Sequence, residues 1–214
     1  MNENIIRFYL ITNQLKQKIR TGWQEVEISA ERLESVAEHI YGCLMLAVAI
    51  DSEYQLSLDM YKVLKMLALH ELEETLMKDF TIRDAISAEQ KLELGRRCVV
   101  KATEGLVKQQ EIEDLLEEFN AHQTKESIFC YHIDKIECDF QAKLYDLEGS
   151  FQLEKALEDL RYFGDKGMEI KAKTKTASDV WIEYDKPRYE EDIIFKTLIT
   201  DIQKLNSKEV FKNE

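Results

Sequence analysis

Apolar side chains recur along this chain every three to four residues, which is the spacing of an amphipathic α-helix. The clearest example runs over residues 33–50, where six apolar residues share one helical face: Val36, Ile40, Cys43, Leu44, Ala47 and Val48. Side chains at such spacings point the same way because a helix completes a turn in about 3.6 residues. The pattern therefore predicts a core helix over residues 33–50.

The same periodicity predicts helices through most of the remaining sequence. Their ranges are 3–20, 57–77, 87–108, 111–120, 124–147, 151–163 and 189–205. Polar residues mark two of the helix starts: Asp59 suits the N-terminus of the helix over 57–77, and Ser87 with Gln90 has the form of a capping box. Gly22 breaks the pattern after the first helix, and the polar stretch 164–187, which is rich in lysine and threonine, is predicted to be a loop.

Glycine and proline are scarce, with seven and one residues among 214, which leaves too few turns for a protein of many strands. The length supports one domain, since 214 residues can bury a substantial core and no long linker interrupts the sequence. We therefore expect an all-α helical bundle that forms a single domain over residues 1–214.

The formal net charge of −13 produces a field that repels polyanions, and we expect no nucleic-acid polymer as a partner. A small phosphate ester is compatible with this charge, because a metal ion and one or two basic residues reverse the field locally. The longest apolar run, around residues 43–50, is shorter than the roughly 20 residues that cross a membrane. The N-terminal residues lack the features of a signal peptide. We expect a cytoplasmic protein with no membrane partner.

Four cysteines lie in apolar helical surroundings without CxxC spacing: Cys43, Cys98, Cys130 and Cys138. Free cysteine in such surroundings behaves as a small buried hydrophobe. We expect reduced thiols and no zinc knuckle.

Candidate metal ligands are scattered along the chain. His39, the adjacent pair His70 and Glu71, and Asp134 each fall within a stretch that is predicted to be helical. Two imidazoles and two carboxylates form a mixed nitrogen and oxygen set, which suits Mn²⁺, Co²⁺, Fe²⁺, Ni²⁺ or Zn²⁺ with positions open for water and substrate. The pattern implies no thiolate ligand, which argues against a structural zinc site.

Each of these residues also has a purely structural interpretation. The run from His70 to Glu74 is also typical of a solvated acidic face, and we expect Glu73 to lie on such a face. A single histidine such as His39 is usually a buried or boundary residue, and Asp134 in an apolar helix needs a partner if it is buried. In a continuous helix His70 and Glu74 lie one turn apart and face the same way.

The two remaining histidines, His122 and His132, are left out of the candidate site. His132 stands two residues before Asp134 and therefore points to the opposite side of the helix. We expect His132 to be exposed.

Several short segments follow one another in a characteristic order: RTGW at 20–23, RLESVAEH at 32–39, HELEE at 70–74, Asp79, and ESIFCYHID at 126–134. Together they resemble the HD-domain metal-dependent phosphohydrolases, in the branch of the 5′-deoxynucleotidases, over about two thirds of the chain. One residue departs from the family pattern, because the second histidine is followed by Glu71 where the family has aspartate. Glutamate is still an oxygen ligand, but its extra methylene can change metal preference or weaken binding.

The resemblance implies an all-α HD-type domain with its core at about residues 30–165, a C-terminal helix at 188–206, and a metal site between core helices. It implies one divalent ion (Mn, Co, Fe, Ni, Zn or Mg) with these ligands: His39, His70, Glu71 and Asp134. Glu74 matches the carboxylate that handles the proton in the family, and Asp79 matches a position near the substrate.

Two further positions match substrate-binding residues. Arg20 fits a phosphate clamp, because its planar guanidinium suits bidentate contact, and Trp23 fits packing against sugar or base. The plainer alternatives are a core anchor for Trp23 and a positive charge at a helix C-terminus for Arg20. Glu126 matches an acidic position in close relatives, and the sequence gives it no role.

The implied activity is metal-dependent hydrolysis of deoxyribonucleoside 5′-monophosphates to deoxynucleoside and phosphate. Two alternatives stay open: an HD-type hydrolase of another phosphate ester or a nucleoside triphosphate, and a catalytically silent module that binds nucleotide or metal. A triphosphate would demand more basic residues than Arg20, Arg32 and Lys78 offer, whereas Glu71 and the acidic composition motivate the silent module. The resemblance also implies a homodimer.

Overall fold

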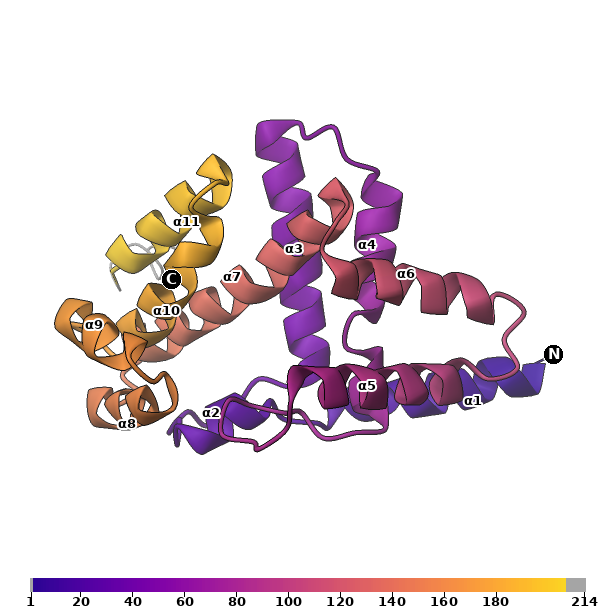
Figure 1. Ribbon diagram of the computed structural model, residues 1–214, viewed down its shortest axis with the longest axis horizontal. Helices are drawn as coiled ribbons and strands as arrows, with labels where there is room; N and C mark the ends of the chain where they lie inside the picture. Colours follow the sequence, from indigo (N-terminus) through magenta and orange to yellow (C-terminus); the bar gives the residue numbers. More distant parts are fainter. Residues whose placement is uncertain (1, 207–214) are drawn as a thin grey trace. The chain divides into compact units, whose positions relative to one another are not determined.

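The computed structural model describes residues 2–206, and helices account for most of them (Figure 1). In chain order the elements are α1 (Asn2–Thr12), η1 (Asn13–Lys16), α2 (Thr21–Glu25), α3 (Val36–Tyr54), α4 (Met60–Leu69), η2 (Leu72–Thr75), α5 (Ala88–Thr103), α6 (Gln109–Ala121), α7 (Lys125–Leu147), α8 (Leu153–Glu158), η3 (Asp159–Tyr162), α9 (Lys166–Lys173), α10 (Asp179–Asp185), η4 (Lys186–Tyr189) and α11 (Ile193–Lys204). Within residues 2–206 the only extended pairing is an isolated bridge between Ile19 and Ser35. The predicted all-α fold class is confirmed.

The chain forms two compact units. The first joins residues 1–21 to 34–133, and the second joins 22–33 to 134–214; residue 1 and residues 207–214 lie outside the described part. Helix α7 begins in the first unit and continues into the second. The expectation of one domain over residues 1–214 stays a prediction.

Local hydrogen bonds at the first turn determine where α3 begins. Ser35 and Glu38 form a reciprocal capping box, in which each side chain accepts a hydrogen bond from the other residue's backbone N–H. The helix consequently begins at Val36, three residues later than predicted, and extends to Tyr54. The capping box predicted at Ser87 and Gln90 is present at the start of α5.

Helix α4 ends much earlier than the predicted range of 57–77. It stops at Leu69, and His70 is its C-cap. Glu71 then leaves helical geometry, with φ −100° and ψ 16°, before the chain enters the short 3₁₀ helix η2. The prediction that His70 and Glu71 lie inside a continuous helix was therefore wrong. The backbone of Glu71 is not helical, so the residues after it do not follow His70 at the spacing of an α-helix.

Two other sequence predictions need correction. The first helix ends at Thr12 instead of continuing to residue 20, and η1 follows it. The stretch 164–187 is mostly helical, since it contains α9, α10 and the beginning of η4. Its helices are short, and they are stabilised by packing, because Ile170 and Val180 are buried in the core of the second unit.

The core of the first unit lies between α3 and α4, which run side by side in Figure 1. Five apolar side chains from these two helices have no exposed surface: Cys43, Ala47, Val63, Met66 and Leu67. A neighbouring cluster packs η2 against α5 and α6 through Leu72, Val99, Ala102 and Leu116. This packing positions the junction between α4 and η2.

Aromatic side chains dominate the core of the second unit. Trp23 is 3% exposed and contacts Tyr145 edge to face, with ring centroids 5.4 Å apart. The ring centroid of Trp181 lies 5.9 Å from that of Trp23. Trp23 is thus a core anchor of this unit.

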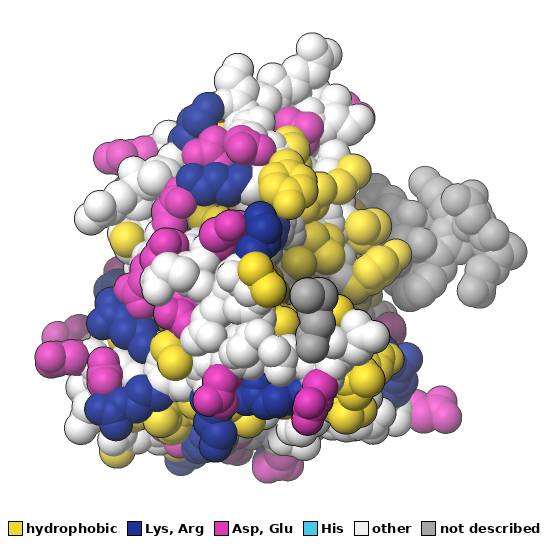
Figure 2. Space-filling view, turned by 90° about the vertical axis from the view of Figure 1, so that its right-hand side faces the viewer, with side chains coloured by type: hydrophobic (Ala, Val, Ile, Leu, Met, Phe, Trp, Pro, Cys, Tyr) yellow, Lys and Arg dark blue, Asp and Glu magenta, His cyan; other side chains and the backbone are white. Residues whose placement is uncertain are grey.

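Charged side chains of both signs are interspersed over the face shown in Figure 2, and a group of hydrophobic side chains lies among them. Some of the exposed apolar groups of the protein come from α1, where Ile5, Ile6, Tyr9 and Leu10 are each more than half exposed. Among residues 2–206, no helix has the length and apolar character needed to cross a membrane.

One buried carboxyl group of the second unit lacks hydrogen-bond partners. Both side-chain oxygens of Asp139 are buried without a partner among residues 2–206. Burial and the nearby charge of Asp185 raise the pKa of Asp139 well above its ordinary value, although Arg188 and Lys135 oppose the shift. The folded protein therefore holds this proton at a pH where the unfolded chain has released it. Stability falls as the pH rises from the ordinary aspartate pKa toward the raised one.

We predict that Asp139→Asn raises the thermal midpoint at pH 8 by roughly 2–4 °C, which corresponds to about 1 kcal/mol in a protein of this size. The gain should be smaller at pH 5, because protonating the aspartate carboxyl, which is ionised in the unfolded chain, costs less free energy there. Thermal unfolding followed by circular dichroism at the two pH values measures both effects.

Asp179→Asn is a matched control for this prediction. The carboxylate of Asp179 accepts hydrogen bonds from the backbone N–H groups of Lys175 and Thr176 and from the amide of Gln203. Its substitution should lower the midpoint at pH 8. An equal loss of stability at both pH values in Asp139→Asn would contradict the argument.

Candidate metal centre

His70 is held in one orientation by the end of α4. Its Nδ1 atom lies 2.7 Å from the carbonyl oxygen of Leu67, and because a carbonyl only accepts, Nδ1 must carry the hydrogen. The hydrogen bond leaves the lone pair of a neutral imidazole on Nε2. A metal-binding histidine is usually oriented in this way, by a hydrogen bond from the ring nitrogen that does not bind the metal to a backbone carbonyl or a carboxylate.

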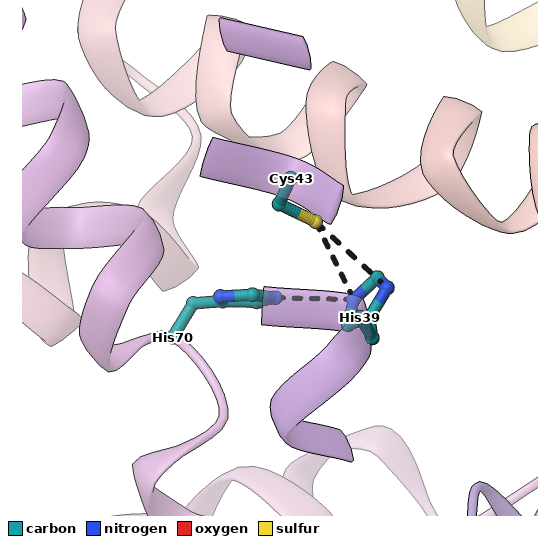
Figure 3. A group of neighbouring side chains, drawn as sticks. All are labelled: His39, Cys43 and His70. Atoms are coloured by element: carbon teal, nitrogen blue, oxygen red, sulfur yellow. Dashed lines mark hydrogen bonds between the residues drawn. The ribbon is translucent and has the colours of Figure 1, made fainter. Parts of the chain in front are cut away.

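His39 meets His70 from the neighbouring helix α3. The two Nε2 atoms are 3.3 Å apart, and the rings are inclined at 60° (Figure 3). His39 has no exposed surface, and His70 is 7% exposed. Two imidazole nitrogens therefore converge in a buried place, although the residues are 31 positions apart in sequence.

Glu71 completes a triangle with these nitrogens. Its Oε1 atom lies 3.6 Å from the Nε2 atom of His39 and 3.6 Å from that of His70. A point equidistant from the three atoms is about 2 Å from each, which agrees with metal bonds of about 2.0–2.2 Å to nitrogen and oxygen. The donor types and spacing thus fit one divalent cation, and the role of Glu71 as a ligand stays a prediction.

A thiol adjoins the same pair of histidines. The Sγ atom of Cys43, one turn after His39 on α3, lies 3.6 Å from Nε2 and 3.8 Å from Nδ1 of that histidine (Figure 3). His39, Cys43 and His70 are all buried, and together they form a group of potential metal ligands. The four cysteines are free, and Cys138 is partly exposed while the other three are buried, which agrees with the expected apolar surroundings.

Asp134, the fourth predicted ligand, lies on α7 as expected. Its carboxylate is buried and pairs with Lys135, with 2.7 Å between Oδ2 and Nζ. Asp134 is the first residue of the second unit and follows Ile133, the last residue of the first. Its role as a metal ligand stays a prediction.

Glu74, the predicted catalytic carboxyl, is 6% exposed and lies in η2. Burial, followed by the charges of Glu71 and Asp79, raises the pKa of Glu74 to about 9, against the opposing charges of Lys18 and Arg20. Its Oε2 atom is buried without a hydrogen-bond partner in the described residues. This carboxyl therefore holds a proton at neutral pH.

Lys18 is a residue of this site that the sequence did not indicate. Its ammonium group donates hydrogen bonds to the carbonyls of Glu74 and Met77 and lies 3.9 Å from Oε2 of Glu74. These bonds hold the chain after η2. Lys18 follows η1 in a non-helical segment, and no spacing or motif in the sequence marks it.

Asp79 and Arg20 lie near enough to this carboxyl group for their charges to act on it. Oδ2 of Asp79 accepts a hydrogen bond of 2.7 Å from the backbone N–H of Thr21, immediately after Arg20. The guanidinium of Arg20 is 3.9 Å from Glu34, and its charge acts on Glu74. Asp79 and Arg20 thus belong to the electrostatic surroundings of Glu74, while their substrate roles stay predictions.

Trp23, the other predicted substrate residue, is buried in the aromatic core of the second unit. This location agrees with the alternative of a core anchor, and contact with a sugar or base stays a prediction. Glu126, which had no predicted role, accepts a hydrogen bond from the backbone N–H of Asp59 at the start of α4.

The structure corrects two exposure predictions. Glu73 is only partly exposed, and its carboxylate faces Gly95 so closely that a Cβ atom there would lie 2.2 Å from Oε2. Burial, and then the charge of Glu71, raises the pKa of Glu73 to about 7. His132 is buried at 8% exposure, because the side of α7 opposite Asp134 is also covered.

Known proteins are similar to this chain over most of its length. The model of the HD domain family matches residues 12–165. The 5′-deoxynucleotidase HDDC2 of Dictyostelium discoideum is 32% identical over 167 residues, which cover 75% of this chain and 86% of the relative. The 5′-deoxynucleotidase hdd1 of Schizosaccharomyces pombe is 28% identical over 167 residues, covering 75% and 81%.

Two solved structures share the fold. A conserved hypothetical protein from Pyrococcus furiosus has a TM-score of 0.62 at 22% identity and covers 94% of this chain and 99% of its own. A predicted metal-dependent phosphohydrolase from Magnetospirillum magnetotacticum MS-1 has a TM-score of 0.62 at 18% identity, with 94% and 90% covered. These similarities concern the fold.

The chain therefore belongs to the HD domain family of all-α proteins. Within that family its relatives at 26–32% identity are 5′-deoxynucleotidases, so the resemblance inferred from the motifs is confirmed.

We predict that Glu71→Gln lowers the affinity for Mn²⁺ by at least about tenfold, because it removes the negative charge that faces two imidazoles while keeping the side-chain length. Isothermal titration calorimetry measures the affinity. Glu73→Gln is the matched control, since its carboxylate faces α5 instead, and it should bind Mn²⁺ like the wild type. Unchanged affinity in Glu71→Gln would remove this residue from the site.

Proposed function

We propose that this protein is a metal-dependent phosphomonoesterase that converts deoxyribonucleoside 5′-monophosphates to deoxynucleoside and phosphate. The observation that supports it most directly is the convergence of His39, His70 and Glu71, with the lone pair of His70 fixed toward the centre by its bond to Leu67. The names of the relatives support the substrate class.

We assign one divalent ion to this site, with Mn²⁺, Co²⁺, Fe²⁺, Ni²⁺, Zn²⁺ and Mg²⁺ as candidates. When bound, such an ion activates water and polarises a phosphoryl oxygen. Asp134 is the proposed fourth ligand. It follows Cys130 by one turn of α7, and the thiol of Cys130 contacts the carbonyl of Val63 on α4, the helix whose C-cap is His70.

Glu74 transfers the proton in this proposal. A positive charge beside Glu71 would lower the pKa of Glu74, so that its carboxylate could accept a proton from the attacking water. The neutral carboxyl, which burial favours, would then donate this proton to the 5′ oxygen as the bond between that oxygen and phosphorus breaks. Burial keeps bulk water from exchanging that proton freely.

Basic groups near Glu74 provide the attraction for phosphate. Lys18 and Arg20 are the cations that act on this carboxyl, and the guanidinium of Arg20 has the fork geometry that suits two phosphoryl oxygens. Two cations match a monophosphate better than a triphosphate, which carries more negative charge. Trp23 remains a proposed neighbour of the sugar or base.

We predict that Glu74→Gln lowers kcat for a deoxynucleoside monophosphate by about 10²–10⁴-fold, the usual contribution of a positioned acid or base. Metal affinity should stay within a few fold of the wild type, because Glu74 is not proposed as a ligand. Steady-state phosphate release and Mn²⁺ calorimetry on the same preparation separate the two effects. Full activity in Glu74→Gln would show that another group transfers the proton.

The substrate class is tested by phosphate release from deoxy- and ribonucleoside 5′-monophosphates, with Mn²⁺ or Co²⁺ in one arm and a chelator in the other. We expect metal-dependent release that is faster for the deoxy forms. A nucleoside triphosphate belongs in the same panel, with separate detection of phosphate and triphosphate as products. Absence of release with every metal and substrate would leave a module that binds nucleotide without hydrolysing it.

The homodimer and the cytoplasmic location implied by the sequence stay predictions. Sedimentation of the purified protein tests the first of them.

A further inference from the structure

The backbone of Lys18 is fastened to the start of α3. Its carbonyl accepts a hydrogen bond of 2.8 Å from the backbone N–H of Val36, the first residue of that helix. The next residue along the chain, Ile19, forms an antiparallel bridge with Ser35. His39 follows Val36 by three residues on α3. Lys18 is therefore held close in the chain pairing to the helix that carries one of the two converging histidines.

The side chain of Lys18 reaches the segment that carries the predicted catalytic carboxyl. Its ammonium group donates hydrogen bonds to the carbonyl of Glu74, over 2.7 Å, and to the carbonyl of Met77. These carbonyls lie in the last turn of η2 and just after it, where a helix leaves its carbonyl groups without partners of its own. Met77 stands two residues before Asp79. Lys18 thus holds the stretch of chain that contains both Glu74 and Asp79.

The contacts of the ammonium group favour a role toward the protein over direct binding of phosphate. Two of the three hydrogens of an ammonium group are engaged by the carbonyls of Glu74 and Met77. The Nζ atom also lies 3.9 Å from Oε2 of Glu74, and the two side chains are 23% and 6% exposed. Direct phosphate binding would require Lys18 to give up its bonds to the backbone.

We propose that Lys18 is a positioning residue, which sets the place of the Glu74 carboxyl relative to the metal donor His39. The inference rests on the proposed function, in which Glu74 transfers the proton. A proton-transfer group must lie within hydrogen-bond reach of the reacting oxygen, and a displacement of about 1 Å can lower the rate on the order of a hundredfold. Lys18 limits such displacement because it connects the start of α3 to the end of η2.

The metal donors have supports that do not involve Lys18. Nδ1 of His70 is bonded to the carbonyl of Leu67, and His39 lies on a helix that begins with its own capping box. Loss of the Lys18 side chain should therefore affect the place of Glu74 more than the binding of the ion. This difference makes the proposal testable.

Lys18→Met removes the ammonium group and keeps an unbranched side chain of similar length. We expect kcat for a deoxynucleoside monophosphate to fall by at least about tenfold, with KM and the Mn²⁺ affinity within a few fold of the wild type. Steady-state phosphate release and calorimetry on one preparation measure the three quantities. A raised KM at unchanged kcat would make Lys18 a phosphate-binding group and overturn the proposal, as would a loss of Mn²⁺ affinity that parallels the loss of kcat.

Lys16→Met is the matched control for this substitution. Lys16 is exposed, and its ammonium lies over the ring of Tyr9, with 5.8 Å between Nζ and the ring centroid. This variant loses the same charge two residues earlier in the chain and should keep the wild-type kcat. An equal loss of kcat in Lys16→Met and Lys18→Met would indicate an effect of net charge and overturn the proposal.

The strongest test repeats Lys18→Met in the Glu74→Gln protein. If Lys18 acts through Glu74, its removal should change kcat by less than about twofold in this background, because residues that act as a unit do not contribute additively. A general structural defect would lower kcat by the same factor in both backgrounds. Equal factors would therefore overturn the proposal.

Two other substitutions separate positioning from folding. Lys18→Arg also donates to two carbonyls and keeps the charge, so it should retain at least about a third of the wild-type kcat. Lys18→Gln is one bond shorter and replaces methionine in both backgrounds if circular dichroism shows that Lys18→Met does not fold. Folded arginine and methionine variants with equally low kcat would contradict the assignment.

The outcomes also distinguish this inference from the proposed function. If Glu74→Gln is impaired and the loss caused by Lys18→Met is the same in both backgrounds, the Lys18 inference fails and the hydrolase stands. If the wild type releases no phosphate from any nucleotide with any metal, the proposed function fails and the inference fails with it.

Discussion

The hydrogen bond from Nδ1 of His70 to the carbonyl of Leu67 is the interaction on which the candidate site depends. This bond engages Nδ1 of the ring and one carbonyl oxygen near the end of α4. It therefore fixes both the tautomer and the direction of the imidazole. The helix ends there, and Glu71 turns back so that its carboxylate faces the other ring nitrogen, Nε2 of His70. A helix that continued through residue 77 would carry Glu71 to the side and separate the donors.

Burial and the charges of its neighbours explain why the pKa of Glu74 is raised. Glu71, Glu74 and Asp79 repel one another, and Lys18 and Arg20 compensate only part of that repulsion. The deeply buried Glu74 responds by holding a proton. A cation bound beside Glu71 would relieve the same repulsion, which couples metal binding to the protonation of Glu74.

The sequence predicted those features that depend on local patterns. The all-α class and the capping box at Ser87 follow from periodicity and short-range hydrogen bonding, and the family motifs brought out His39, His70 and Glu71. The end of α4 was missed because helical periodicity continues past Leu69. The segment that follows it is held by Lys18, which contacts the carbonyl of Glu74 from 56 positions away in sequence. No motif in the sequence marks Lys18 or Cys43, because only the fold brings them close to the site. The short helices of 164–187 were missed because they depend on the burial of Ile170 and Val180.

The capping box of Ser35 and Glu38 has a consequence for the buried histidine of α3. The backbone N–H of His39 donates to the carbonyl of Ser35, so His39 lies in the first turn of the helix, which the capping box closes. Helix ends fray at this turn first. Loss of the two capping bonds would therefore release the backbone that carries the imidazole facing His70 before it disturbed the rest of the helix.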